Sequence, residues 1–218
     1  MPRSSQVPGG GLHEPLPALL DELRRCRICR DAPRSGGPLP HVPRPVIQAS
    51  AEARICIAGQ APGTRAHASG RPYTDPSGVR LRAWLQLDEA TFYDPRKIAI
   101  VPMGFCFPGH DALGGDLPPR RECADVWRAR VMARLPNIEL MLLIGQYAQR
   151  WHLARTATVG GVTGTVGRWR EIYGASSRPR LLALPHPSWR NSGWLKRNPW
   201  FEMDLLPVLR ADVAQLVA

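Results

Sequence analysis

Four short apolar segments, separated by turns and by stretches of helical periodicity, constrain the fold of this chain most strongly. They are residues 54–58, 98–101, 139–144 and 180–184. Each is rich in β-branched or aliphatic residues and too short for a typical helix, which favours a buried strand. Strands that alternate with helices form a parallel sheet with helices on both faces. We therefore predict an α/β fold, a three-layer αβα arrangement around a central, mostly parallel four-stranded sheet.

The segments between these strands predict helices. Leu16, Leu19, Leu20 and Leu23 recur at helical spacing and define one apolar face. Further helices are expected over residues 77–87, with Ser77 as a candidate N-cap, and over residues 118–135, 146–153 and 199–217. Residues 1–13 are rich in Gly, Pro and Ser and predict a disordered tail. We expect residues 14–218 to form a single domain.

Length and composition exclude several classes of protein. The chain has 218 residues, of which 44% are hydrophobic, enough for one buried core. No apolar run reaches the ~18 residues that a membrane span needs. The first residues lack the apolar stretch of a signal peptide, so we expect a cytoplasmic protein with no membrane partner. In that compartment the five cysteines are expected to be thiols or metal ligands and not a disulfide framework.

The charge points to a polyanionic partner. The chain carries 29 Lys and Arg against 18 Asp and Glu, a formal net charge of +11, and only Lys97 and Lys196 are lysines. Arginine suits phosphate recognition because its planar fork pairs with two oxygens at once. Nucleic acid is the commonest such partner, although a basic surface that is merely solvated would have the same composition.

Three segments follow predicted strands and should meet at one edge of the sheet. They are the glycine-rich turn 59–63, residues 102–106, and residues 186–191. Ligands of parallel α/β sheets bind beyond the carboxyl ends of the strands. We therefore expect these segments to share a cleft.

Four cysteines outside the predicted strands form a candidate metal site. Cys26 and Cys29 are separated by two residues, and Cys106 and Cys123 by sixteen. Four thiolates hold either a tetrahedral zinc ion or an iron–sulfur cluster. Cys56 lies inside a predicted buried strand, where a cysteine acts as a small hydrophobe.

The segment after the fourth strand, LPHPSWRN, holds a histidine between two prolines. This stiff backbone suits an imidazole that must point at one atom, as His186 would. Trp189 beside Arg190 is a pair that stacks on bases and binds phosphates, or alternatively a core tryptophan beside a solvated arginine. For Trp200 and Phe201, at the start of the last helix, we expect a place in the core.

Together these segments resemble the uracil-DNA glycosylase superfamily, most closely its iron–sulfur-containing branch, usually called family 4. That branch has a first motif of the form GEAPG…GxPF…(S/A)G, and this chain reads GQAPG at 59–63, GRPY at 70–73 and SG at 77–78. The second family motif begins with His-Pro, as 186–187 do. The cysteine spacing is also similar, and the resemblance covers about residues 16–197.

The resemblance implies a monofunctional glycosylase of base excision repair, which flips uracil out of DNA and hydrolyses its N-glycosidic bond. In such an enzyme His186 stabilises the leaving uracil anion, assisted by the backbone of Gly59, Gln60 and Ala61, and Tyr73 stacks on the base. It further implies contacts of the second motif with the DNA backbone and with the gap left in the duplex. The residues concerned are Ser188, Trp189, Arg190 and Asn191.

The chain departs from the family pattern at three places. One is the linker 107–117, which differs from the family's basic loop and whose Asp111 and Asp116 indicate solvated loop carboxylates, with a functional Asp116 as the alternative. The other two lie in the first motif and at the base-reading position. Gln60 stands where the branch has Glu, and Ala61 where other branches have Asp or Asn. Asp75 and His67 are then the nearest candidates for orienting water. The Asn with which the family reads uracil is also replaced, because Pro102 occupies its position. Backbone groups of Met103 or Gly104 are left to do the reading.

The resemblance also implies partners and a cofactor. It implies a [4Fe–4S] cluster, with zinc or no metal as alternatives, on the ligands Cys26, Cys29, Cys106 and Cys123. DNA containing uracil would be the substrate, and a monomer suffices to bind one flipped nucleotide. The missing carboxylate motivates an alternative, a catalytically weak member of the superfamily that binds damaged or abasic DNA.

Overall fold

A computed structural model describes residues 14–34, 36–175 and 178–218 of the chain. Its centre is a sheet of β1 (Ile55–Ala58), β2 (Ile98–Ile100), β3 (Leu140–Ile144) and β4 (Arg180–Leu184). The strand order is β2-β1-β3-β4, and each neighbouring pair is parallel. The predicted α/β fold is therefore confirmed, with every pairing in the sheet parallel.

Helices and helical turns connect the strands. The α-helices are α1 (Leu16–Arg24), α2 (Ile28–Asp31), α3 (Thr64–Ser69), α4 (Pro76–Leu85), α5 (Glu89–Phe92), α6 (Arg121–Cys123), α7 (Ala129–Met132), α8 (Gly145–His152), α9 (Gly161–Gly167), α10 (Trp169–Ala175), α11 (Ser192–Arg197) and α12 (Leu206–Val217). The shorter elements are the π-helical η1 (Ala124–Arg128) and η4 (Phe201–Leu205) and the 3₁₀ turns η2 (Arg155–Thr158) and η3 (Trp189–Asn191).

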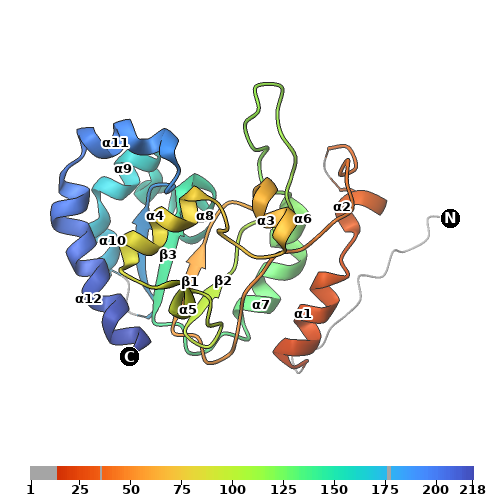
Figure 1. The fold of residues 1–218 in the computed structure, drawn as a ribbon, viewed down its shortest axis with the longest axis horizontal. Helices are drawn as coiled ribbons and strands as arrows, with labels where there is room; N and C mark the ends of the chain where they lie inside the picture. Colours follow the sequence, from red (N-terminus) through yellow and green to blue (C-terminus); the bar gives the residue numbers. More distant parts are fainter. Residues whose placement is uncertain (1–13, 35, 176–177) are drawn as a thin grey trace.

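The two faces of the sheet bury separate hydrophobic clusters, because successive side chains of a strand point to opposite faces. Along β1, Ile55 and Ile57 belong to one cluster and Cys56 and Ala58 to the other. The first cluster is covered by α4, α5, α9, α10, η4 and α12. The second is covered by α1, α2, α6, η1, α7 and α8. Figure 1 shows α12 and α10 on one side of the strands and α1 and α7 on the other, which completes three layers.

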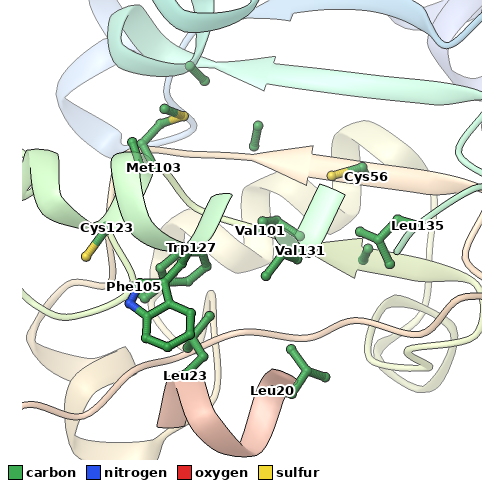
Figure 2. Packing of buried hydrophobic residues seen from close by; sticks show 14 of the residues in the cluster. Leu20, Leu23, Cys56, Val101, Met103, Phe105, Cys123, Trp127, Val131 and Leu135 are labelled. Atoms are coloured by element: carbon green, nitrogen blue, oxygen red, sulfur yellow. The ribbon is translucent and has the colours of Figure 1, made fainter. Parts of the chain in front are cut away.

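The second cluster joins the N-terminal helix to the sheet. The apolar face predicted for the first helix is confirmed, since its four leucines are buried. Figure 2 shows the Trp127 ring beside Phe105 and Leu23, with Cys56 on β1 apart from Cys123. Cys56 is fully buried, so its predicted role as a small hydrophobe is confirmed.

Several helix boundaries differ from the sequence prediction. The helix expected over residues 118–135 begins only at Arg121, after a pair of prolines, and passes through the π-helical η1 before α7. Ser77 is not the N-cap of α4, because Pro76 occupies the first helical position and Asp75 therefore precedes the helix. The last predicted helix starts with the π-helical η4, whose Phe201 is buried as expected.

The strand order creates a crevice at one edge of the sheet. The chain runs from β1 to β2 on one side and then crosses to β3 on the other, so connections diverge at the carboxyl ends of β1 and β3. Gly145 ends β3 with φ +76°, a conformation that favours glycine, and α8 begins there at once. This edge is where the predicted site segments emerge.

Two further predictions concern the ends and the surroundings of the chain. The predicted tail, residues 1–13, lies outside the described residues. None of the described helices combines the length and the apolarity that a bilayer crossing requires.

Candidate active site

The segments after β1 and β2 are joined by backbone hydrogen bonds that continue the sheet. The Met103 N–H donates to the Gly59 carbonyl at 2.8 Å, and the Gly104 N–H to the Gln60 carbonyl at 2.9 Å. Gly104 also packs closely on Pro119, where a Cβ would lie 2.9 Å from the proline ring. The N–H groups of Met103 and Gly104, which the sequence offered for reading the base, are thus used internally. Only the carbonyls of these two residues remain for that purpose.

The same bonds leave two donors free in the turn after β1. The carbonyls of Gly59 and Gln60 are held, which fixes the orientation of the turn. Among the hydrogen bonds of the described residues, none uses the N–H groups of Gln60 or Ala61. The Gln60 side chain is occupied elsewhere, because its Nε2 donates to the Leu117 carbonyl at 3.1 Å. The turn therefore presents neutral, preorganised donors and no carboxylate.

Tyr73 is clamped against this turn. Its φ is +54°, a left-handed conformation that is unusual for a side-chain-bearing residue. Its carbonyl accepts a hydrogen bond from the Tyr93 hydroxyl at 3.0 Å and lies so close to Gly78 that a Cβ there would come within 1.8 Å. Its own hydroxyl would lie 2.8 Å from a Cβ at Gly59. Phe92 packs edge-on against the ring, with the two centroids 6.2 Å apart.

His186 emerges from β4 at the same edge of the sheet. It follows the buried Pro185, and burial lowers the pKa of its imidazole below the ordinary histidine value. Asp75 and Asp116 are the carboxylates close enough to oppose that shift. Asp75 lies two residues after Tyr73 and also raises the pKa of the Tyr73 phenol, although burial is the larger cause of that rise. His186 therefore shares its surroundings with the segment that holds Tyr73, and it is a neutral imidazole at pH 7.

The residues after His186 divide into anchors and exposed groups. Asn191 is an anchor, because its Nδ2 donates to the His186 carbonyl at 2.7 Å. This contact differs from the DNA contact that the sequence predicted for Asn191. Trp189 is 70% exposed, and the Arg190 guanidinium lies 5.9 Å from its ring centroid. The pair is thus on the surface and not in the core. The Ser188 hydroxyl makes no hydrogen bond to the described residues.

Arg80 is a site residue that the sequence did not single out. Its Nη1 donates to the Ser188 carbonyl at 2.8 Å, and its Nη2 to the Ser192 hydroxyl at 3.1 Å. It therefore ties α4, which follows the first motif, to the second motif. One arginine among so many carries no sequence signal for this contact.

His67 lies in different surroundings from His186. Its ring packs on His41, with centroids 4.6 Å apart, and on Phe107 at 6.0 Å. Burial, His41 and Arg44 lower the pKa of His67. These contacts place the His67 ring against Phe107, at the base of the loop 107–119, and its role in orienting water stays a prediction.

An open hollow of about 690 Å³ adjoins Tyr73 on its outer side. Its wall includes Asp75, Arg65, Arg80 and Arg82. Glu89 also lines the hollow, so three guanidinium groups and two carboxylates leave it with a small positive excess next to the candidate site.

The four candidate metal ligands line one apolar pocket. Cys26, Cys29, Cys106 and Cys123 share it with Leu23, Phe105 and Trp127. The neighbouring Cys123 thiol, together with burial, raises the pKa of Cys29. Burial, and to a lesser extent the nearby thiols of Cys26 and Cys29, raise the pKa of Cys106 to about 12. The indole N–H of Trp127 donates to the Cys26 sulfur at 3.3 Å.

The spacing of these thiols bears on which metal they fit. In the part of the chain that the structure describes, no three His, Cys, Asp or Glu side chains gather as a site for one ion. A single zinc ion needs four sulfurs at about 2.3 Å from one point. An iron–sulfur cubane binds each thiolate to a different iron, so its ligands stand farther apart. Four thiolates that line one pocket are a donor set that either group accepts.

Comparison with known families decides the classification. A model described as the Uracil DNA glycosylase superfamily matches residues 47–210, which include the whole sheet and both motifs. The chain belongs to the uracil DNA glycosylase superfamily. Membership supports a glycosylase-type hydrolase that acts on DNA in repair. The matched range begins after Cys26 and Cys29, so it does not address the iron–sulfur branch.

Proposed function

We propose that the chain is a monofunctional uracil-DNA glycosylase, which acts as a monomer and releases uracil to leave an abasic site. The observation that carries this proposal is the arrangement at the carboxyl edge of the sheet. A neutral, half-buried His186 shares its surroundings with Asp75, and Tyr73 is clamped against the donor-bearing turn after β1. An aromatic platform, an imidazole donor and free backbone N–H groups are the parts that a leaving pyrimidine anion requires.

Tyr73 is the platform for the flipped base in this mechanism. Extrusion of the nucleotide costs a few kcal/mol in lost stacking and pairing, which contacts in the enzyme must offset. Stacking on an aromatic ring recovers part of that cost. The rigid backbone of Tyr73, held by Tyr93 and Gly78, supports this role because a fixed ring loses little entropy on binding.

The bond between C1′ and N1 then breaks and leaves its electron pair on uracil. His186 donates a hydrogen bond to the uracil O2 as negative charge develops there. Its lowered pKa is compatible with this role, because a neutral imidazole still carries one N–H that can donate to the anion. The free N–H groups of Gln60 and Ala61 are available to the same oxygen. Donors that gain strength as the charge develops lower the barrier more than they tighten ground-state binding.

The second motif is suited to hold the DNA around the flipped nucleotide. Trp189 is exposed next to Arg190, so an apolar wedge and a phosphate ligand stand side by side. The Ser188 hydroxyl is available for a neighbouring phosphate. Arg80 and Asn191 keep this segment in register with His186.

We also propose that Cys26, Cys29, Cys106 and Cys123 hold a [4Fe–4S] cluster. When bound, the cluster would serve as a cross-link between the N-terminal helices and the segment 106–123, and not as a redox centre for the base. The Arg120 guanidinium, which donates to the Gly37 carbonyl at 2.8 Å, already connects the same two parts of the chain. The Trp127 N–H to the Cys26 sulfur is the kind of bond that tunes such clusters.

A base-release assay tests the proposed activity. Single- and double-stranded oligonucleotides that contain U, hypoxanthine, xanthine or a T:G mismatch are incubated with the protein and cleaved at abasic sites. We expect release of uracil. His186→Ala should lower the rate about 10²- to 10³-fold, with little change in DNA affinity. Intact uracil substrates under conditions where a control glycosylase cuts them would refute the proposal. Tight binding without release would support a DNA-binding member of the superfamily instead.

A further inference from the structure

The loop 107–119 brings a carboxylate to the turn after β1, where the sequence itself provides none. We propose that Asp116 orients and deprotonates the water that attacks C1′, and that His110 is the positioning residue that holds Asp116. This inference rests on the proposed glycosylase function and adds to it the base that the first motif lacks.

The loop is anchored at its base and fixed at its tip. Phe107 is buried and stacks on His41, with centroids 5.5 Å apart and planes 12° from parallel. At the tip, Asp111 Oδ1 accepts hydrogen bonds from the N–H groups of Leu113 and Gly115, at 2.9 and 2.8 Å. The returning strand is therefore held in a defined position relative to the outgoing one.

Asp116 is held by a short chain of hydrogen bonds that ends on the first motif. Its Oδ1 lies 3.2 Å from Nδ1 of His110, on the opposite side of the loop. The Nε2 of His110 lies 3.1 Å from the hydroxyl of Thr64, the first residue of α3. When Nδ1–H donates to Asp116, Nε2 is the acceptor for the Thr64 hydroxyl, so a neutral imidazole satisfies both contacts.

The loop also contacts the turn after β1 directly. Oδ2 of Asp116 lies where a Cβ at Gly63 would meet it at 3.7 Å, an ordinary contact distance. The next residue, Leu117, accepts the hydrogen bond from the Gln60 side chain. Asp116 is thus seated on the segment that carries the free N–H groups, and it acts on His186 from there.

Asp116 suits the role better than Asp75, the other carboxylate that acts on His186. Asp75 is the N-cap residue of the ten-residue helix α4, and its side chain makes no capping hydrogen bond that would fix its orientation. Asp116 instead has a histidine partner that fixes the orientation of its carboxylate. Its side chain and that of His110 are each 46% exposed, as a group that meets water at the mouth of a site requires.

The proposed step balances. The C1′–N1 bond breaks and its electron pair leaves with uracil as an anion. The water oxygen forms the new bond to C1′, and its proton passes to the Asp116 carboxylate. The proton then reaches solvent or the departing uracil, which restores the enzyme.

Single-turnover base release from a uracil oligonucleotide tests the proposal. Asp116→Asn keeps the size of the side chain but removes its basicity, and we expect a rate loss of about 10²-fold, the low end for a general base. Asp111→Asn is the matched control, because an amide oxygen can still accept the bonds from Leu113 and Gly115. Its rate should stay within about twofold of the parent. Formate should restore part of the rate of Asp116→Ala by supplying a carboxylate in solution.

A separate pair of variants tests the positioning role of His110. His110→Asn keeps a donor near the Nδ1 position, whereas His110→Leu removes it. We expect about a tenfold lower rate for the leucine variant and a rate nearer the parent for the asparagine variant, with DNA affinity equal in both. Equal rates for the two variants would contradict the positioning role.

The outcomes separate this inference from the proposed function. A parent protein that releases no uracil refutes the function, and with it this inference. An active parent whose Asp116→Asn variant is equally active, or whose Asp75→Asn variant alone is impaired, refutes only the role of Asp116. Two further results overturn the role of Asp116. One is that formate fails to restore activity to Asp116→Ala. The other is that the rate loss of Asp116→Asn is matched by an equal loss of DNA affinity.

Discussion

Replacement of Gly59 by alanine tests how the first motif positions its aromatic ring. The backbone of Gly59 is not in the left-handed region, so alanine adds no backbone strain there. The new Cβ would lie 2.8 Å from the Tyr73 hydroxyl oxygen, whereas ordinary contacts begin at 3.4 Å. The ring must therefore move by about 0.6 Å, and Tyr93 and Gly78 prevent the backbone of Tyr73 from following. A misplacement of about 1 Å costs on the order of 10²-fold in rate, so we expect a loss of about 10- to 10²-fold.

A second substitution isolates the cause of that loss. Tyr73→Phe removes the clashing oxygen, after which the nearest ring atom, Cζ, lies 3.8 Å from the new Cβ. The double variant should therefore recover most of the activity that Gly59→Ala loses. The Tyr73→Phe variant alone should remain active, since it keeps the stacking surface. This recovery corresponds to a coupling of about 1.4 to 2.8 kcal/mol in transition-state free energy.

Single-turnover release of uracil from a defined oligonucleotide, together with melting temperature and DNA affinity, measures these effects. Activity of Gly59→Ala equal to that of the parent would show that the ring position does not matter. A double variant no more active than Gly59→Ala would show that the lost activity has a cause other than the hydroxyl contact. The first result refutes the assignment of Tyr73 as the platform for the base, and the second refutes the explanation by the hydroxyl contact.

Three further predictions test the cofactor, the DNA surface and the pH dependence of stability. Cys123→Ser should lose both iron and the absorbance near ~400 nm of the purified protein, whereas Cys56→Ser should keep both; equal iron in the two variants would contradict the proposed ligand set. Arg190→Ala should weaken DNA binding and lower the salt dependence by about one counterion, measured by anisotropy, whereas Arg96→Ala, at the amino-terminal edge of the sheet, should change neither. Burial, and then the charge of a neighbouring arginine, lower the pKa of His152 to about 3. The unfolded chain therefore takes up a proton below about pH 6.5 that the folded protein refuses, and stability falls as the pH falls. The unfolding free energy of the parent should fall between pH 7 and 5, and in His152→Gln this fall should be smaller by about 2 kcal/mol. An equal fall in the variant and the parent would contradict this prediction.

Some contacts in the site could not be predicted from the sequence. They join residues that are far apart along the chain, and they depend on how the side chains are oriented in the folded protein. Arg80 meets the Ser188 carbonyl across 108 residues, and one arginine in an arginine-rich chain carries no mark of that contact. The sequence alone indicates a solvated loop carboxylate at Asp116. In the structure its Oδ2 lies 3.7 Å from where a Cβ at Gly63 would be. The N–H groups of Met103 and Gly104 were candidates for base reading until the sheet extension engaged them.

Periodicity and local motifs determined the class of fold, because the spacing of apolar residues decides which segments become strands and which become helices. They also indicated the candidate chemistry of the site in outline: a proline-flanked imidazole, a glycine-rich turn and a cysteine quartet. Only the tertiary structure decided which groups face each other. The crossing between β1 and β3 sets the crevice, the burial of His186 sets its protonation, and the packing of the 107–119 loop sets which carboxylate reaches the turn. Those properties depend on distances and desolvation, which are fixed only when separate segments pack together.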